Sequence, residues 1–143
     1  MEQFQLSERT ILFLREIRKW SKIIAITGFV AVGLMVVAGV VMLFFMNTLG
    51  GEVPDVPSWM GIVYLILFLF LAVVYYFPIL YLYRFSENLG QAIDLGNNDF
   101  LTDAFEYLMK HYRFVGIMII IGIILYALSL LAMIVGVMTV SAI

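Results

Sequence analysis

Three long stretches of this sequence contain no charged residue and no histidine. They are residues 23–46, 59–83 and 114–143, with 24, 25 and 30 residues respectively. About 20 helical residues cross a bilayer core of about 30 Å, so each stretch is long enough to span it. Spanning β-strands would show about ten residues of alternating polarity, and no such alternation occurs. The sequence therefore predicts an all-α membrane protein with three transmembrane helices.

The composition agrees with lipid as the main solvent of the chain. Hydrophobic residues make up 64% of it and charged residues 13%, against about half and about a quarter in soluble proteins. A soluble domain of this size has too little interior to bury so much apolar surface. The chain has no cysteine, which excludes disulfides and thiolate metal sites.

The basic residues predict the orientation of the spans. All eight precede the first span or lie between the second and third: Arg9, Arg15, Arg18, Lys19, Lys22, Arg84, Lys110 and Arg113. Because Lys and Arg in short loops stay on the cytoplasmic side, we expect a cytoplasmic N-terminus and an external C-terminus. Residues 47–58 then form an external loop.

Residues 7–22 are expected to form an amphipathic interfacial helix ahead of the first span. Ser7 suits a helix N-cap, and Glu8 suits the first turn. One face carries Ile11, Leu14, Ile17 and Trp20. Another carries the predicted membrane-surface cations Arg15, Arg18, Lys19 and Lys22. Trp20 with these cations suits the headgroup zone of the bilayer, and recognition of anionic lipid or of a protein is the alternative role of this helix.

Residues 84–113 are expected to form a cytoplasmic helical hairpin that extends the second span (59–83) and the third (114–140). Its expected apolar positions are Phe85, Leu89, Ala92 and Ile93, then Phe100 or Leu101, Ala104 or Phe105, Leu108 and Tyr112. Gly96 suits the end of the first arm, and Asn98 or Asp99 is expected to cap the second. The hairpin is a candidate docking surface for a cytoplasmic protein partner.

No catalytic, cofactor-binding or metal-binding residue is predicted. The acidic residues near Asn97 lack the spacing of a calcium loop. His111, beside Lys110 and Arg113, is expected to be interfacial. The spans lack the ionisable residues that mark ion paths and proton relays, and their hydroxyls have no partner base. We therefore expect neither an enzyme nor a cofactor, and no nucleic-acid partner.

Small residues recur within the spans and predict helix packing. They are Gly28 and Gly39 in the first span, and Gly122, Ser129, Ala132 and Gly136 in the third. Helices in lipid associate through close backbone approach at such positions. The packing can occur within the chain or between copies, and because three spans are few to enclose anything alone, we expect a homo-oligomer.

Two segments resemble a known family. FLREIRKWSKIIAITGF (residues 13–29) is an aromatic and basic segment that enters a glycine-containing span, and AFEYLMKHYRFVGI (residues 104–117) enters the last span. Both are similar to small bacterial multipass membrane proteins known only as a domain of unknown function. The resemblance implies a bacterial cytoplasmic (inner) membrane and cytoplasmic helix extensions. It implies no activity, ligand or catalytic residue.

The expected function is that of a non-enzymatic membrane protein with a structural or partner-docking role in a homo-oligomer. The alternative is a small oligomeric channel or pore subunit, because a hydrophobic constriction can gate a pore without charged lining.

Overall fold

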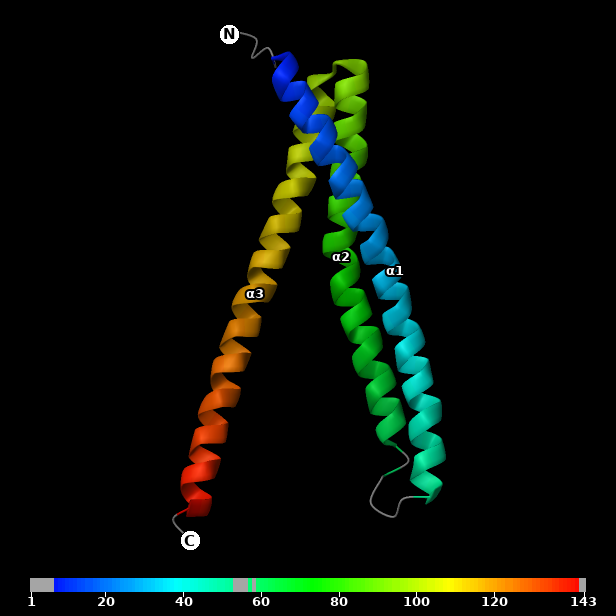
Figure 1. The fold of residues 1–143 in the computed structure, drawn as a ribbon, viewed down its shortest axis with the longest axis vertical. Coiled ribbons are helices and arrows are strands. Elements are labelled where there is room, and N and C mark those ends of the chain that lie inside the picture. The colour runs from blue at the N-terminus through cyan, green and yellow to red at the C-terminus, as the bar shows by residue number, and fades with distance from the viewer. Residues whose placement is uncertain (1–6, 53–56, 58, 142–143) are drawn as a thin grey trace. The chain divides into compact units, whose positions relative to one another are not determined.

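The computed structural model describes residues 7–52, 57 and 59–141. In these residues the chain forms three α-helices and no strand: α1 (Glu8–Glu52), α2 (Met60–Leu95) and α3 (Asn98–Ser141) (Figure 1). Each helix is long and apolar enough to cross a membrane. The predicted all-α class with three long apolar helices is confirmed.

Each helix is longer than the span predicted within it. α1 runs without a break through residues 7–22 and 23–46 and continues to Glu52. It is continuous because residues 8–27 contain neither proline nor glycine. The predicted loop 47–58 therefore begins with helix, and its residues 53–56 and 58 lie outside the described part.

The chain divides into two compact units, Met1–His111 and Tyr112–Ile143. In the first unit α1 and α2 lie side by side (Figure 1), and the first residues of α3 complete it. The second unit, where it is described, is the remainder of α3, a single helix.

Close backbone contact between α1 and α2 depends on glycine. The contacting pairs are Gly28 with Ile79, Gly39 with Phe68, and Gly61 with Leu43. A Cβ atom at either of the first two glycines would lie 2.9 Å from the partner side chain, and one at Gly61 would lie 3.0 Å from a backbone oxygen. The numbering of the pairs shows that the two helices run antiparallel. Of these glycines, the sequence analysis did not single out Gly61.

A small core lies where α1, α2 and the start of α3 meet. Phe85, Leu89 and Ala104 are buried there. Around them pack Leu14, Leu82, Ile93, Leu101, Tyr107 and Leu108. On α3 the packed face uses Leu101 and Ala104, whereas Phe105 is exposed.

The helix ends follow local capping chemistry, with one correction. The Thr10 amide donates to Ser7 Oγ at 3.2 Å, which confirms Ser7 as an N-cap. Gly96 has φ 61° and is the left-handed residue that ends α2, as predicted. The prediction that Asn98 or Asp99 caps α3 is wrong: the Asp99 amide donates to Asn97 Oδ1 at 2.8 Å. An N-cap side chain must precede the first helical residue to reach these amides.

Candidate functional site

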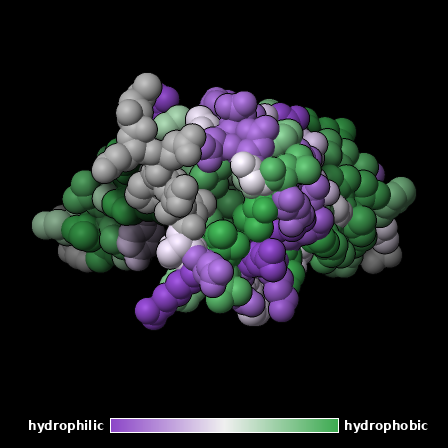
Figure 2. Space-filling view, turned by 90° about the horizontal axis from the view of Figure 1, so that it is seen from above, coloured by the Kyte–Doolittle hydropathy of each residue, from purple (hydrophilic) through white to green (hydrophobic). Residues whose placement is uncertain are grey.

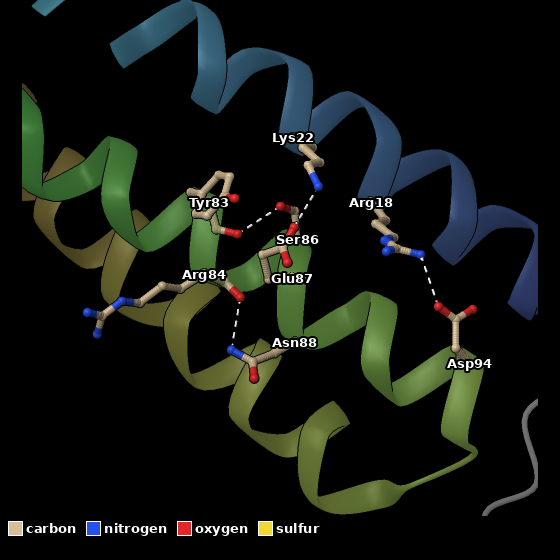
Figure 3. Close-up of polar contacts among 8 residues, drawn as sticks. All are labelled: Arg18, Lys22, Tyr83, Arg84, Ser86, Glu87, Asn88 and Asp94. Carbon is tan, nitrogen blue, oxygen red and sulfur yellow. Dashed lines mark hydrogen bonds and ion pairs between the residues drawn. The ribbon is translucent and has the colours of Figure 1, made fainter.

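Two ion pairs join α1 to α2 (Figure 3). Lys22 Nζ donates to Glu87 Oε1 at 2.7 Å, and Arg18 NH1 lies 3.5 Å from Asp94 Oδ2. We call these four residues, together with Gly90, the polar clamp. All of them belong to the first unit.

The clamp is a consequence of helical spacing in two antiparallel helices. Arg18 and Lys22 are four residues apart, so they share one face of α1. Glu87, Gly90 and Asp94 are separated by three and four residues, so they share one face of α2. The antiparallel course places the first cation opposite the later acid and the second cation opposite the earlier one.

Gly90 makes room for the Arg18 side chain. A Cβ atom at position 90 would collide with the Arg18 guanidinium, whose Cζ, Nε and NH2 atoms occupy that space. The planar guanidinium is therefore packed on the backbone of α2, beside the carboxylate of Asp94.

The two ion pairs differ in tightness. The hydrogen bond from Lys22 to Glu87, and then the charge of Glu87, raises the pKa of Lys22 above its ordinary value. The Arg18 distance of 3.5 Å exceeds the about 2.7–2.9 Å of a charge-assisted hydrogen bond. Asp94 is also 60% exposed. Lys22 is thus held by a short hydrogen bond to Glu87, whereas Arg18 is held mainly by its packing on Gly90 and only weakly by Asp94.

A groove of about 570 Å³ lies beside the clamp on α1. We call it the basic groove. Its lining residues are Arg15, Arg18, Lys19, Lys22, Ile23, Ile26 and Asp94. Arg15 and Lys19 are exposed and form no ion pair with any residue that the structure describes. Figure 2, which views this end from above, shows hydrophilic residues beside hydrophobic ones.

The predicted membrane-surface residues thus fall into two groups. All four cations line the groove, but only Arg18 and Lys22 also form ion pairs with residues of α2. Trp20 is 58% exposed, as a residue of the membrane interface would be.

The expected apolar face of residues 7–22 does not pack as one surface. Leu14 borders the core, but Ile17 and Trp20 are exposed. The face that meets the rest of the unit contains Leu14, Arg18, Ser21 and Ala25, at spacings of four, three and four. A search for apolar residues at helical spacing does not identify this face, because two of its residues, Arg18 and Ser21, are polar.

Within the described part of the second unit, which is one helix, the predicted packing residues of α3 have no other helix to pack against. A Cβ atom at Gly122 or Gly136 would meet no heavy atom within 4 Å. Ser129 Oγ donates to the Tyr126 carbonyl of the preceding turn at 2.7 Å, and Ala132 is exposed.

His111 bonds to the backbone of α2 at its internal proline. Its Nδ1 lies 2.7 Å from the carbonyl oxygen of Pro78. A carbonyl oxygen only accepts, so Nδ1 carries the proton in this contact. The only histidine of the chain thereby ties the start of α3 to α2.

A second basic and aromatic cluster surrounds Tyr107. Arg84 NH1 lies 3.4 Å from the Tyr107 hydroxyl, and the Arg84 and Lys110 side chains lie over its ring. Glu106 Oε1 accepts from Lys110 at 2.6 Å, and this hydrogen bond raises the pKa of Lys110. These contacts stabilise the junction of α2 and α3.

Sequence analysis missed Glu87 and Gly90, and considered Asp94 only as a member of a calcium loop, which the spacing of the acidic residues excludes. The spacing of 87, 90 and 94 on one helix, opposite in charge to 18 and 22 on another, is the signal that could have found the clamp. Within residues 7–52, 57 and 59–141, no group of three or more His, Cys, Asp or Glu residues could hold a metal ion.

Comparison with known proteins identifies a family, but this family has no assigned activity. Residues 60–137 match a family described as a family of unknown function (DUF5362). The match covers all of α2 and most of α3 and includes residues 104–117, whereas residues 13–29 lie outside it. No curated protein and no solved structure matches the chain.

Proposed function

The chain belongs to the family of unknown function DUF5362, and we propose that it is a non-enzymatic integral membrane protein that assembles with copies of itself. In this proposal the contact between copies is made by the apolar part of α3. Residues 84–113 dock a cytoplasmic protein.

The observation that carries the proposal is the contrast between the predicted packing glycines of α1 and those of α3. Gly28 and Gly39 are filled by side chains of α2, whereas Gly122 and Gly136 have open space at the Cβ position. The small residues of α3 therefore offer a face on which another helix can pack closely, and we infer that this helix belongs to a second copy. Close packing at small residues drives helix association in lipid, and a second copy supplies an identical face.

The proposed membrane and orientation are those of a bacterial cytoplasmic membrane with the N-terminus inside and the C-terminus outside. The distribution of Lys and Arg supports this arrangement. Single cysteines at Ser7, Asn97 and Pro57 test it in a chain without native cysteine. Labelling of positions 7 and 97 from one side and of position 57 from the other is expected; a shared side for 57 and 97 contradicts it.

Disulfide cross-linking in membranes tests the assembly. A chain with one cysteine forms a disulfide only with another copy, so the Ser129→Cys variant reports contact between copies directly. We expect cross-linked dimers at positions 122, 129 and 136, which share one face. Ile124→Cys and Leu131→Cys, about half a turn away, are the matched controls. Equal cross-linking on both faces, or none on either with a monomeric particle, would refute the proposal.

The alternative function is that of a channel. Measuring ion flux from liposomes that contain the protein distinguishes a channel from a purely structural protein. Absence of conductance for small ions across a range of voltages and membrane tensions would remove it. A conductance that is lost when cross-linking fixes α3 would favour it over the structural role.

A further inference from the structure

We propose that the basic groove binds the phosphate of an anionic phospholipid headgroup, with Arg15, Arg18 and Lys19 as its ligands. The inference does not depend on assembly of copies through α3. It rests on the charge of the groove, on the weak ion pair between Arg18 and Asp94 and on the order of residues along α1.

The groove carries an excess of positive charge. Four cations and one carboxylate line it, a difference of three charges. Counting Glu87, the partner of Lys22, the excess is two. A concave surface with unpaired charge of one sign concentrates ligands of the opposite sign. Arg15 and Lys19 supply this excess, since neither is paired within the described part of the chain.

Arg18 lines the groove and has the weaker of the two ion pairs. Its distance to the exposed Asp94 is 3.5 Å, whereas Lys22 is held at 2.7 Å by Glu87. A guanidinium presents a planar fork of donors that matches a phosphate. Arg18, a residue of the polar clamp, is therefore the third ligand of the phosphate. An incoming phosphate must displace Asp94 from Arg18.

The order of the lining residues selects a lipid over a soluble anion. From Arg15 to Ile26 the helix rises about 16 Å, at about 1.5 Å per residue. The lining changes over this length from cations to Ile23 and Ile26, the first of which begins the predicted span. A phospholipid has the same order, charged headgroup and then acyl chain, and the exposed Trp20 marks the interface between them. A free phosphate would make no use of the isoleucines.

Binding of short-chain phosphatidylglycerol to the full-length protein in zwitterionic detergent tests the site. Native mass spectrometry counts bound lipids, and phosphatidylcholine with the same acyl chains is the reference. We expect a preference for phosphatidylglycerol on the order of tenfold or more, given several basic residues near the headgroup, and a fall in this preference with added salt.

The double variant Arg15→Gln/Lys19→Gln is expected to lose most of this preference, on the order of tenfold. Both side chains are exposed, so the variant should fold, and its circular dichroism verifies this. The matched control is Arg9→Gln/Arg113→Gln, which removes the same charge from residues that do not line the groove. This control should keep the preference.

Three results would overturn the proposal. One is equal binding of the two lipids by the native chain, a result that needs no variant. Another is an equal loss in the control variant, which would mean that overall charge and not the groove attracts the lipid. The third is full displacement of phosphatidylglycerol by millimolar inorganic phosphate or by a polyglutamate peptide, which would assign the groove to a soluble anion or to an acidic protein.

Discussion

The guanidinium of Arg18 on α1 occupies the space above Gly90 on α2 that any side chain at position 90 would need. Glycine here does not serve backbone flexibility, because Gly90 lies inside a regular helix. It serves as a platform on which a cation of another helix rests beside Asp94. The ion pair and the close helix contact are thus one feature.

Replacing Gly90 by alanine is expected to displace Arg18 without unfolding the protein. The colliding atoms are the far end of a flexible side chain, which can move, and alanine favours helix over glycine by about 1 kcal/mol. Arg18 should therefore become several-fold more reactive toward phenylglyoxal, measured by mass spectrometry against Arg9 in the same chain. Gly33→Ala, which meets no atom within 4 Å, should leave the reactivity unchanged. Unchanged reactivity in Gly90→Ala would contradict the platform role.

Gly39→Ala is expected to destabilise the α1–α2 pair. The new methyl group would lie 2.9 Å from the Cβ atom of Phe68, which cannot move without its backbone. Overpacking of this kind costs about 1–3 kcal/mol. Unfolding in detergent should occur at lower temperature or lower denaturant concentration than for the native chain. Gly33→Ala, in the same span with open space around it, should be neutral or slightly stabilising, and a similar shift in both variants would show that the close contact is not the cause.

Leu89→Ala tests the small core at the meeting of the three helices. Leu89 is fully buried, so its truncation is expected to cost about 2–5 kcal/mol. Leu95→Ala is the matched control on the same helix, because Leu95 is 67% exposed, and it should change stability by no more than about 0.5 kcal/mol. Thermal unfolding followed by circular dichroism compares the two. A small effect of Leu89→Ala would mean that this core does not hold the first unit together.

The fold was predictable where the signal is local. The uncharged runs identify the three apolar helices, and the caps at Ser7 and Gly96 follow from the chemistry of single residues. The end of α1 was less predictable, because residues 47–52 contain two glycines and yet continue the helix. The cap of α3 was predicted at Asn98 or Asp99 and lies at Asn97, because several neighbouring polar residues can each cap a helix.

The candidate site was only partly predictable because its partners are distant in sequence. Arg18 and Asp94 are 76 residues apart, and Lys22 and Glu87 are 65 apart. A cation near a predicted span looks lipid-facing from its neighbours alone, and for Arg15 and Lys19 the structure gives no partner that changes this. For Arg18 and Lys22 the antiparallel register of α1 and α2 decides the contact, and the glycine contacts along these two helices, Gly90 among them, belong to the same register.

The Lys22–Glu87 pair predicts a specific pH dependence. The pKa of Lys22 is raised in the folded protein by its hydrogen bond to Glu87. Its contribution to stability is therefore complete below the ordinary lysine value of 10.5 and is lost as pH rises through the higher, folded-state pKa. The difference in unfolding temperature between the native chain and Glu87→Gln should be constant from about pH 7 to 9 and shrink above about pH 10.5. Glu16→Gln, which removes an acid with no ion pair among the described residues, should show no such change. A difference that persists unchanged at high pH would mean that Glu87 acts through something other than Lys22.

The bond from His111 to Pro78 makes a prediction about how α3 begins. The Nδ1 donor of His111 reaches the carbonyl oxygen at 2.7 Å, and a single hydrogen bond contributes about 1 kcal/mol. His111→Phe keeps a ring but has no donor, so opening of the start of α3 should become about fivefold more frequent. Hydrogen exchange of residues 98–111, followed by mass spectrometry, measures this opening.

His111→Asn is the control for that measurement, because the amide nitrogen of asparagine lies where Nδ1 of histidine lies. It should retain most of the protection that His111→Phe loses. Equal loss in both variants would show that the imidazole ring holds α3 by packing alone. Equal protection in both would show that the contact with Pro78 does not tie α3 to α2, and the core around Leu89 would then be sufficient to hold the start of α3 in place.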